Sequence, residues 1–295
     1  MRTPVFTGTC PALVTPFHES GQIDYDAFAK LIDHQISAGV DAVCVCGTTG
    51  ESASLSMQEH DDLIEFCINR VNGRVKVIAG TGSNNTAVAA NAARRAQQLG
   101  ADALLIVTPY YNKATQTGLI RHYETIASRT NLPIILYNVP SRTGMSFTAE
   151  TYAILAKIPN INGVKEASGN LTLITRTREC CPDDFSIWSG NDDQVVPMMA
   201  QGAKGVISVA SNIIPEIMVQ MSHLCLSGDF RSAAKLQIEY SKLIDALFIE
   251  VNPIPVKAAM ELFGMCSGHL RLPLSPISSF NLDVLRKELL QLELI

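Results

Sequence analysis

One lysine lies where an amine could take part in chemistry, near the end of a short apolar segment. Residues 161–166 read Ile-Asn-Gly-Val-Lys-Glu, a composition typical of a buried strand. Strand alternation predicts that Ile161, Gly163 and Lys165 share a face, and the missing side chain at Gly163 would leave room beside the lysine. A desolvated lysine amine can attack a ketone and form an electron-withdrawing iminium. The alternative is a lysine that ends a strand and points at solvent, and both interpretations stay open at this point.

A hydroxyl group lies at a similar place in the apolar run before this one. Tyr137 is near the end of Ile134–Asn138, so the two side chains would meet if both runs are neighbouring strands of a parallel sheet. Iminium chemistry needs a group that moves protons, and a tyrosine hydroxyl can do so. The alternative is a tyrosine that only packs in the core or at its rim.

Two further segments could bind carboxylates. Gly47-Thr48-Thr49-Gly50-Glu51 predicts a tight turn that exposes backbone N–H groups, although its threonines could equally cap the next element. Its spacing is not that of a nucleotide-binding loop. Arg142 follows Tyr137 closely, and its planar guanidinium could bind a second carboxylate or simply be solvated at the surface.

The order of the elements explains how these residues could come together. Short apolar runs alternate with segments of helical periodicity, which predicts parallel βα units. Eight consecutive units without a dinucleotide fingerprint favour a single (β/α)8 TIM barrel, whose active site would lie at the carboxyl ends of the strands. The predicted strands are Cys10–Val14, Ala42–Cys46, Val75–Ala79, Leu104–Thr108, Ile134–Asn138, Ile161–Glu166, Phe185–Ser189 and Gly205–Val209.

The chain continues beyond the predicted barrel. We expect residues 1–225 to form the catalytic barrel and residues 226–295 to form a helical extension packed on it. Within the extension, residues 229–251, 255–264 and 281–293 have helical patterns. The segment Ser56-Met57-Gln58-Glu59 has the pattern of a capping box and predicts the start of a helix.

Composition excludes several classes of function. A net charge of −5 without long runs of one sign argues against nucleic acid and membrane partners, and no stretch is long and apolar enough to span a bilayer. The start of the chain does not resemble a signal peptide, so we expect a cytoplasmic protein. The eight cysteines never form C-x-x-C, which predicts reduced thiols, and the six scattered histidines suggest no metal site. We expect no cofactor.

The motifs together resemble the dihydrodipicolinate synthase family, over essentially the whole chain. The wider group of pyruvate-dependent class I aldolases and N-acetylneuraminate lyases shares the barrel, the turn, the tyrosine and the lysine, whereas the arginine is more specific to the synthases. The segments that carry the resemblance are GTTGES (47–52), TPYYN (108–112), YNVPSRTG (137–144), GVKEASGNL (163–171), SGND (189–192), GVISV (205–209) and NPIPVK (252–257).

The resemblance implies roles for particular residues. Lys165 would form a Schiff base with pyruvate, and Tyr137, Thr48 and Tyr111 would relay protons. Thr48 and Thr49 would hold the pyruvate carboxylate, and Arg142 would hold that of L-aspartate 4-semialdehyde. Gly190 and Ile207 would line the pocket. The implied product is 4-hydroxy-tetrahydrodipicolinate, on the diaminopimelate route to lysine.

The resemblance also implies assembly and regulation. Tyr111 would be donated across a tight dimer, and two dimers would form a homotetramer. Members of the family that lysine inhibits have a histidine and a glutamate where this chain has Met57 and Val88. Because these two residues differ, the sequence predicts weak or absent inhibition by lysine. The other residues of that site match the family. They are Ser52, Ala53, His60, Asn84 and Tyr110.

Two other functions remain as alternatives. A lyase acting on N-acetylneuraminate or 2-keto-3-deoxygluconate would share Lys165 and Tyr137, but Arg142 argues against it. A barrel that only binds small molecules would not need a complete set of amine and hydroxyl groups. Lys113, Lys204 and Lys257 also compete for the role of nucleophile, but none of them is predicted at the carboxyl end of a strand.

Overall fold

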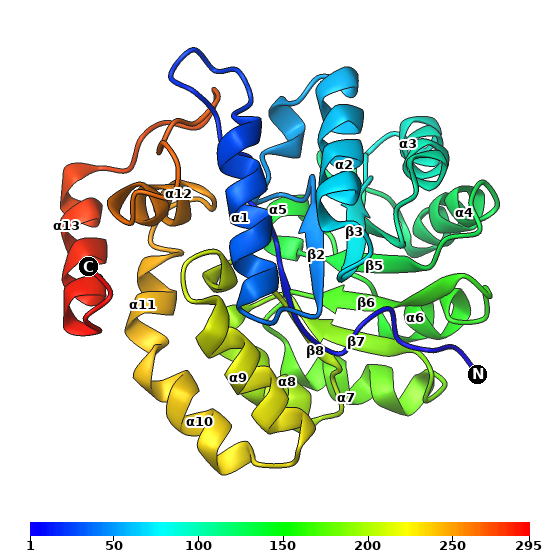
Figure 1. Cartoon of the computed structure of the whole chain (residues 1–295). Helices are drawn as coiled ribbons and strands as arrows, with labels where there is room; N and C mark the ends of the chain where they lie inside the picture. The colour runs from blue at the N-terminus through cyan, green and yellow to red at the C-terminus, as the bar shows by residue number, and fades with distance from the viewer.

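The computed structural model describes residues 1–295 and contains one sheet of eight parallel strands, closed into a barrel (Figure 1). Neighbouring strands follow the chain order, and β1 pairs with β8. A bridge between Ala12 and Cys44 joins β1 to β2 and closes the ring. The predicted (β/α)8 barrel is therefore confirmed. The strands are β1 (Gly8–Pro11), β2 (Ala42–Val45), β3 (Lys76–Gly80), β4 (Ala103–Val107), β5 (Ile134–Asn138), β6 (Ile161–Glu166), β7 (Ser186–Ser189) and β8 (Gly205–Ser208).

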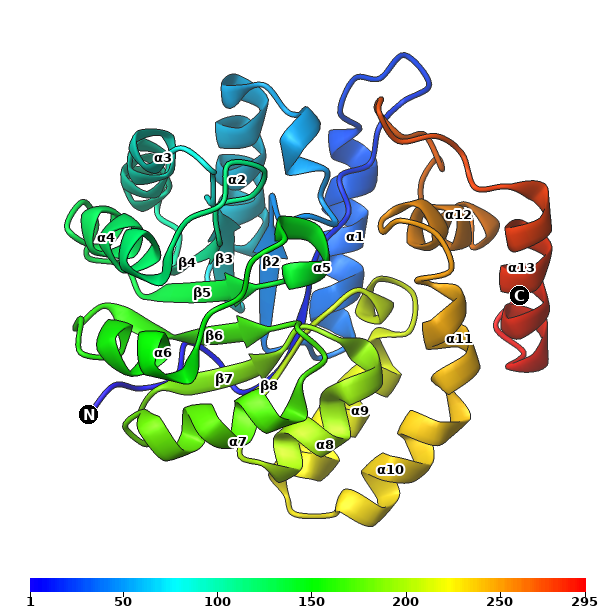
Figure 2. The ribbon, with the colours of Figure 1, turned by 180° about the vertical axis from the view of Figure 1, so that it is seen from behind.

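Helices surround the barrel, as Figure 2 shows from behind. Side-chain caps mark the starts of most of them, though not of α8 and α9: Asp24 caps α1, and Ser56 and Glu59 form the predicted capping box at the start of α2. A short helix, α5 (Pro140–Thr143), follows β5 directly. The helices of the ring are α1 (Tyr25–Ser37), α2 (Met57–Val71), α3 (Thr86–Leu99), α4 (Gln116–Ala127), α6 (Ala149–Leu155), α7 (Leu171–Cys180), α8 (Val195–Ala200) and α9 (Pro215–Leu226).

The C-terminal region is helical and lies beside the barrel (Figure 1). Helix α10 contacts α8 and α9, α11 contacts α13, and α12 contacts the turn at Ala210–Asn212. The helix predicted over 229–251 is divided at Tyr240, and its last residues are not helical. The boundary at residues 225 and 226 stays a prediction. The four helices are α10 (Phe230–Glu239), α11 (Ser241–Ala246), α12 (Ile254–Leu262) and α13 (Ser279–Gln291).

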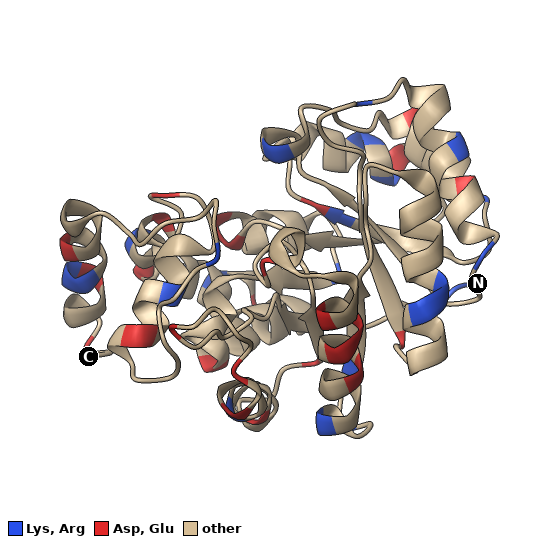
Figure 3. Ribbon diagram, turned by 90° about the horizontal axis from the view of Figure 1, so that it is seen from above, with Lys and Arg blue, Asp and Glu red and all other residues tan.

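Charges of both signs are spread over the helices around the barrel and in the C-terminal region (Figure 3). The net charge of −5 is therefore not gathered on a single element. No helix of the structure has both the length and the apolar character that crossing a membrane requires.

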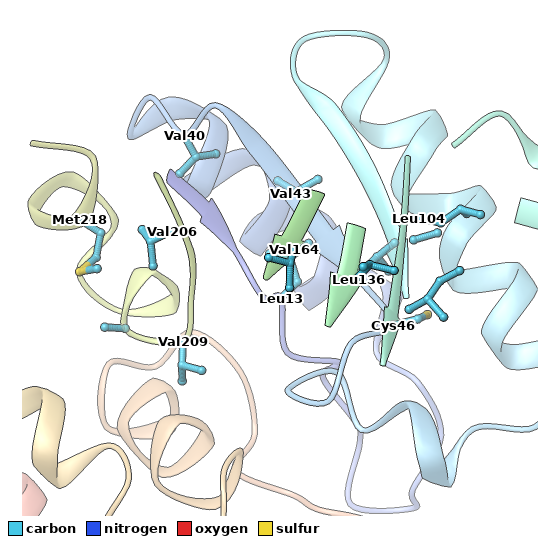
Figure 4. Packing of buried hydrophobic residues seen from close by; sticks show 14 of the residues in the cluster. Leu13, Val40, Val43, Cys46, Leu104, Leu136, Val164, Val206, Val209 and Met218 are labelled. Atoms are coloured by element: carbon cyan, nitrogen blue, oxygen red, sulfur yellow. The ribbon is translucent and has the colours of Figure 1, made fainter. Parts of the chain in front are cut away.

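The strands bury both of their faces, which is why their sequences are almost continuously apolar. Outward residues such as Leu104, Leu136 and Val164 pack with the helices in one large cluster, part of which is shown in Figure 4. Inward residues form a separate cluster that includes Tyr137 and Ile207. Side chains therefore fill the barrel as a packed core, and chemistry is possible only at its mouth.

Strand β6 departs from simple alternation. The register against β5 shifts between the pair Ile134–Ile161 and the pair Ile135–Gly163, so Asn162 is an extra residue. Ile161 consequently packs in the outer cluster and does not share a face with Lys165, contrary to the prediction. The role expected for Gly163 also changes, because a Cβ there would overlap the carbonyl oxygen of Ser186 on β7. Gly163 thus permits close approach of two strands.

We predict that Gly163→Ala lowers the free energy of unfolding by about 1–3 kcal/mol, because β6 and β7 must separate to accommodate the methyl group. Urea denaturation at fixed protein concentration measures this change. Gly118→Ala in α4 is the control, since its Cβ would lie 3.5 Å from its nearest neighbours, an ordinary contact. Equal stability of Gly163→Ala and the unmodified protein would contradict the explanation.

Candidate active site

A cavity of about 420 Å³ opens at the carboxyl ends of the strands. The turn after β2 contributes Thr48, β5 contributes Tyr137, and α5 contributes Arg142. The C-terminal region contributes Asn252 and Arg271. The structure therefore brings three of the predicted site residues together around one space, together with residues from outside the barrel.

Lys165 is not itself among the residues that line this cavity, but it lies in the interior of the barrel next to Tyr137, which does line it. Its side chain is only 5% exposed, and its Nζ lies 4.6 Å from the centre of the Tyr137 ring. The two residues are direct partners in the β5–β6 register. A cation above an aromatic face is a favourable contact, and it places the amine next to the tyrosine.

No carboxylate neutralises the Lys165 amine: it takes part in none of the ion pairs of the structure. Two buried thiols, Cys10 and Cys44, are close enough for the lysine charge to influence them. Burial nevertheless raises the pKa of the Cys44 thiol to about 11, so this thiol is neutral at pH 7. A buried amine without a counter-charge is suited to act as a nucleophile.

The turn after β2 is tight, as predicted, and its N–H groups fall into two pairs, one bonded within the turn and one unpaired. The N–H groups of Gly50 and Glu51 donate back to the carbonyl oxygens of Gly47 and Thr48, at 3.2 and 3.1 Å. The N–H groups of Thr48 and Thr49 donate to no atom of the chain. These two donors are therefore free to bind an anion at the mouth of the barrel.

Asn252 connects the two predicted carboxylate-binding groups. Its Nδ2 donates to Thr49 Oγ1 at 3.0 Å, and its carbonyl oxygen accepts from Arg142 at 3.1 Å. Asn252 was not predicted as a site residue, although it is the first residue of the segment NPIPVK (252–257), which carries part of the family resemblance. Its distance along the chain from Thr49 and Arg142 leaves no spacing signal that could have revealed these contacts.

The remaining predicted residues differ in their placement. A Cβ at Gly190 would lie 2.7 Å from Ala167 Cβ and 3.0 Å from Lys165 Cε, so a side chain there would displace Ala167 or the lysine chain. Ile207 is completely buried in the inner cluster. Tyr111 does not reach the cavity of its own chain: its side chain is 93% exposed, whereas the adjacent Tyr110 lines the cavity.

A buried ion pair ties α12 to the turn after β2. Lys257 Nζ donates to Glu51 Oε1 at 2.7 Å and to the Thr15 carbonyl oxygen at 2.9 Å, and both charged side chains are almost fully buried. The Arg271 N–H donates to the other oxygen of Glu51, at 3.1 Å. The Lys257 amine therefore serves a structural contact, and because its charge is paired with Glu51 it does not compete with Lys165 as a nucleophile.

We predict that Lys257→Met lowers the free energy of unfolding by about 3–5 kcal/mol, because Glu51 would stay buried without its partner. Urea unfolding at fixed protein concentration gives the value. The double variant Glu51→Gln with Lys257→Met is the control and should recover part of the loss, since no isolated charge remains. If both variants were as stable as the unmodified protein, the pair would not hold α12 in place.

The fold and the site thus indicate the class of protein, an enzyme built as a (β/α)8 barrel with a buried amine near the mouth of the barrel. The profile of the Dihydrodipicolinate synthetase family matches residues 5–292, so the chain belongs to this family. A 4-hydroxy-tetrahydrodipicolinate synthase from Alkaliphilus oremlandii is 49% identical over 285 residues, which cover 97% of this chain and 98% of the relative.

Solved structures agree with this assignment. Dihydrodipicolinate synthase from Acinetobacter baumannii, described as chloride-inhibited and complexed with pyruvate, superimposes with a TM-score of 0.96 at 40% identity, covering 98% of this chain and 99% of that one. The enzyme from Cyanidioschyzon merolae with lysine bound also has a TM-score of 0.96 at 40% identity, covering 99% and 100%. The chain is therefore an enzyme, a lyase of lysine and diaminopimelate biosynthesis.

Proposed function

We propose that the protein condenses pyruvate with L-aspartate 4-semialdehyde through a Schiff base on Lys165, giving 4-hydroxy-tetrahydrodipicolinate. The observation that carries this proposal is the unpaired amine of Lys165, buried at the mouth of the barrel beside Tyr137. The name of the curated relatives and the pyruvate bound to the Acinetobacter baumannii enzyme support the choice of substrates.

The proposed reaction begins with addition of the Lys165 amine to the ketone carbon of pyruvate. Loss of water gives an iminium, and removal of a methyl proton gives an enamine. The enamine carbon attacks the aldehyde carbon of the second substrate, whose oxygen takes up a proton and becomes a hydroxyl. The amino group of that substrate then attacks the iminium carbon, closes the ring and releases the lysine amine.

The residues around Lys165 suit the other requirements of this reaction. Tyr137, whose ring packs against the Lys165 amine, would pass protons to and from the carbinolamine and the enamine. Thr48 would extend this relay, and the free N–H groups of Thr48 and Thr49 would bind the pyruvate carboxylate. Arg142, which lines the cavity, would bind the carboxylate of the second substrate. Gly190, beside the lysine chain, and the buried Ile207 would support the site from behind.

Tyr111 requires a second copy of the chain in this proposal. Its ring is 93% exposed and, unlike that of Tyr110, does not line the cavity of its own chain, which supports a role in a neighbouring subunit. We therefore propose a tight dimer in which Tyr111 completes the proton relay of the partner. Two such dimers would form the predicted tetramer, acting in the cytoplasm without a bound cofactor or metal.

We predict that borohydride reduction in the presence of pyruvate attaches one reduced pyruvate to the peptide that contains Lys165, because reduction makes the Schiff base permanent. Intact mass and peptide mapping measure the product. Lys165→Met should show no adduct and should lose at least ~10³-fold in turnover, whereas the control Lys204→Met should keep both.

Two results would overturn this proposal. A missing adduct in the unmodified protein would reject the Schiff base. An adduct combined with faster release of pyruvate from N-acetylneuraminate or 2-keto-3-deoxygluconate than turnover of aspartate semialdehyde would make the protein a sugar-acid lyase.

We also predict weak or absent inhibition by lysine. Met57 and Val88 are 76% and 47% exposed and offer no charge to bind an ammonium or carboxylate group. A lost charge-assisted hydrogen bond is worth ~1.5–3 kcal/mol, or about one to two decades in affinity. Initial rates at increasing lysine concentration measure the effect, with Val88→Glu as the variant expected to strengthen it. Full inhibition of the unmodified protein below millimolar lysine would refute the prediction.

A further inference from the structure

A buried carboxylate lies directly behind the strand ends that carry Lys165 and Tyr137. Glu166 is the last residue of β6 and follows Lys165, so its side chain leaves the opposite face of the strand. It is 2% exposed and has no cationic partner in any ion pair of the structure. The proposed reaction does not use it.

Neutral donors from three elements satisfy this carboxylate. Asn138 Nδ2, at the end of β5, lies 3.0 Å from both oxygens of Glu166. The Tyr152 hydroxyl of α6 donates to Oε2 at 2.7 Å, and the Ser168 N–H donates to Oε1 at 2.8 Å. We name Asn138, Tyr152, Glu166 and Ser168 the carboxylate clamp.

The carboxylate clamp lies next to the residues of the proposed chemistry in the strand register. Tyr137 pairs with Lys165, and the next pair along the same two strands is Asn138 with Glu166. Backbone hydrogen bonds continue the connection. The Ala167 N–H donates to the backbone carbonyl oxygen of Asn138 at 2.8 Å, and the Gly190 N–H donates to the backbone carbonyl oxygen of Glu166 at 2.8 Å. Movement of Glu166 would therefore displace both the lysine and the wall beside it.

Burying the ionised carboxylate of Glu166 costs folding free energy. Burial raises the pKa of Glu166, and the hydrogen bonds from Ser168, Tyr152 and Asn138 oppose that effect. A leucine at this outward position would suit a barrel strand, whose other outward residues, such as Leu136 and Val164, pack against helices. Stability alone thus gives no reason for an ionisable group here.

We propose that Glu166 is a positioning residue: the carboxylate clamp holds the ends of β5 and β6 in the register that sets the Lys165 amine against Tyr137. This role rests on the Schiff-base function proposed above. It predicts that loosening the clamp slows attack of the amine on pyruvate, because small misplacements of reacting groups have large effects on rate.

Two variants test the role. Glu166→Gln keeps the shape of the side chain but replaces one acceptor oxygen with an amide N–H group, which would face the donors Asn138 and Tyr152. Tyr152→Phe removes one hydrogen bond and leaves the carboxylate in place. Tyr123→Phe is the matched control: Tyr123 is also fully buried and packs against Phe147, but its hydroxyl donates to the Ile106 oxygen at 2.9 Å and not to Glu166.

The main measurement is the rate at which the borohydride-trapped adduct forms on Lys165 at saturating pyruvate, with thermal unfolding in parallel. We expect ~10- to 100-fold slower adduct formation in Glu166→Gln and a smaller decrease in Tyr152→Phe. Steady-state turnover should fall in kcat, with KM for pyruvate changed less than about threefold. Tyr123→Phe should form the adduct at the unmodified rate and unfold at a temperature similar to that of Tyr152→Phe.

Three outcomes reject the role. Adduct formation at the unmodified rate in both clamp variants would reject it and leave the Schiff-base function standing, as would equal slowing in Tyr123→Phe, because general loosening of the core would then explain the effect. Absence of any adduct in the unmodified protein would overturn the proposed function and, with it, this role.

Discussion

Burial of the Lys165 amine without a counter-charge is the constraint on which the arrangement of the site depends. Lysine is almost never fully buried unless it is paired, and here a tyrosine ring and thiols surround the amine, while the buried Asp192 is near enough to interact with its charge but forms no ion pair with it. A closed barrel makes this possible, because its packed interior excludes water from all sides except the mouth. In the proposed reaction, a substrate at the mouth would therefore meet an amine that takes part in no ion pair.

The acidic groups near the strand ends are each occupied elsewhere. Glu51 is paired with Lys257, and Glu166 is directed outward to neutral donors. Asp192 accepts from the N–H groups of Val209 and Ala210, at 3.0 and 2.9 Å. Because their hydrogen bonds fix these carboxylates in place, none of them forms an ion pair with Lys165, and the amine stays free although three acids lie close to the same strand ends.

The C-terminal region completes the mouth of the barrel. Asn252 precedes α12 and contacts both Thr49 and Arg142, while Lys257 within α12 holds Glu51 of the same turn. The turn after β2 is thus fixed from two sides, by its own backbone hydrogen bonds and by side chains from more than 200 positions later in the chain. The barrel strands alone would supply the amine and the tyrosine, but would not fix Thr49 and Arg142, the two groups proposed to bind carboxylates.

The sequence alone determined the alternation of elements and, through it, the positions of Lys165, Tyr137 and Thr48 near strand ends. These features depend on local periodicity and on the rule that parallel strands end at one edge, so no long-range contact is needed to predict them.

Only the tertiary structure decided the rest. The extra residue Asn162 turned Ile161 to the outer face, because register depends on the neighbouring strand. Gly163 and Gly190 proved to be requirements of close approach, by β7 and by the lysine chain. The Asn252 contacts and the Glu51–Lys257 pair join segments far apart in the sequence, and no periodic pattern encodes such contacts.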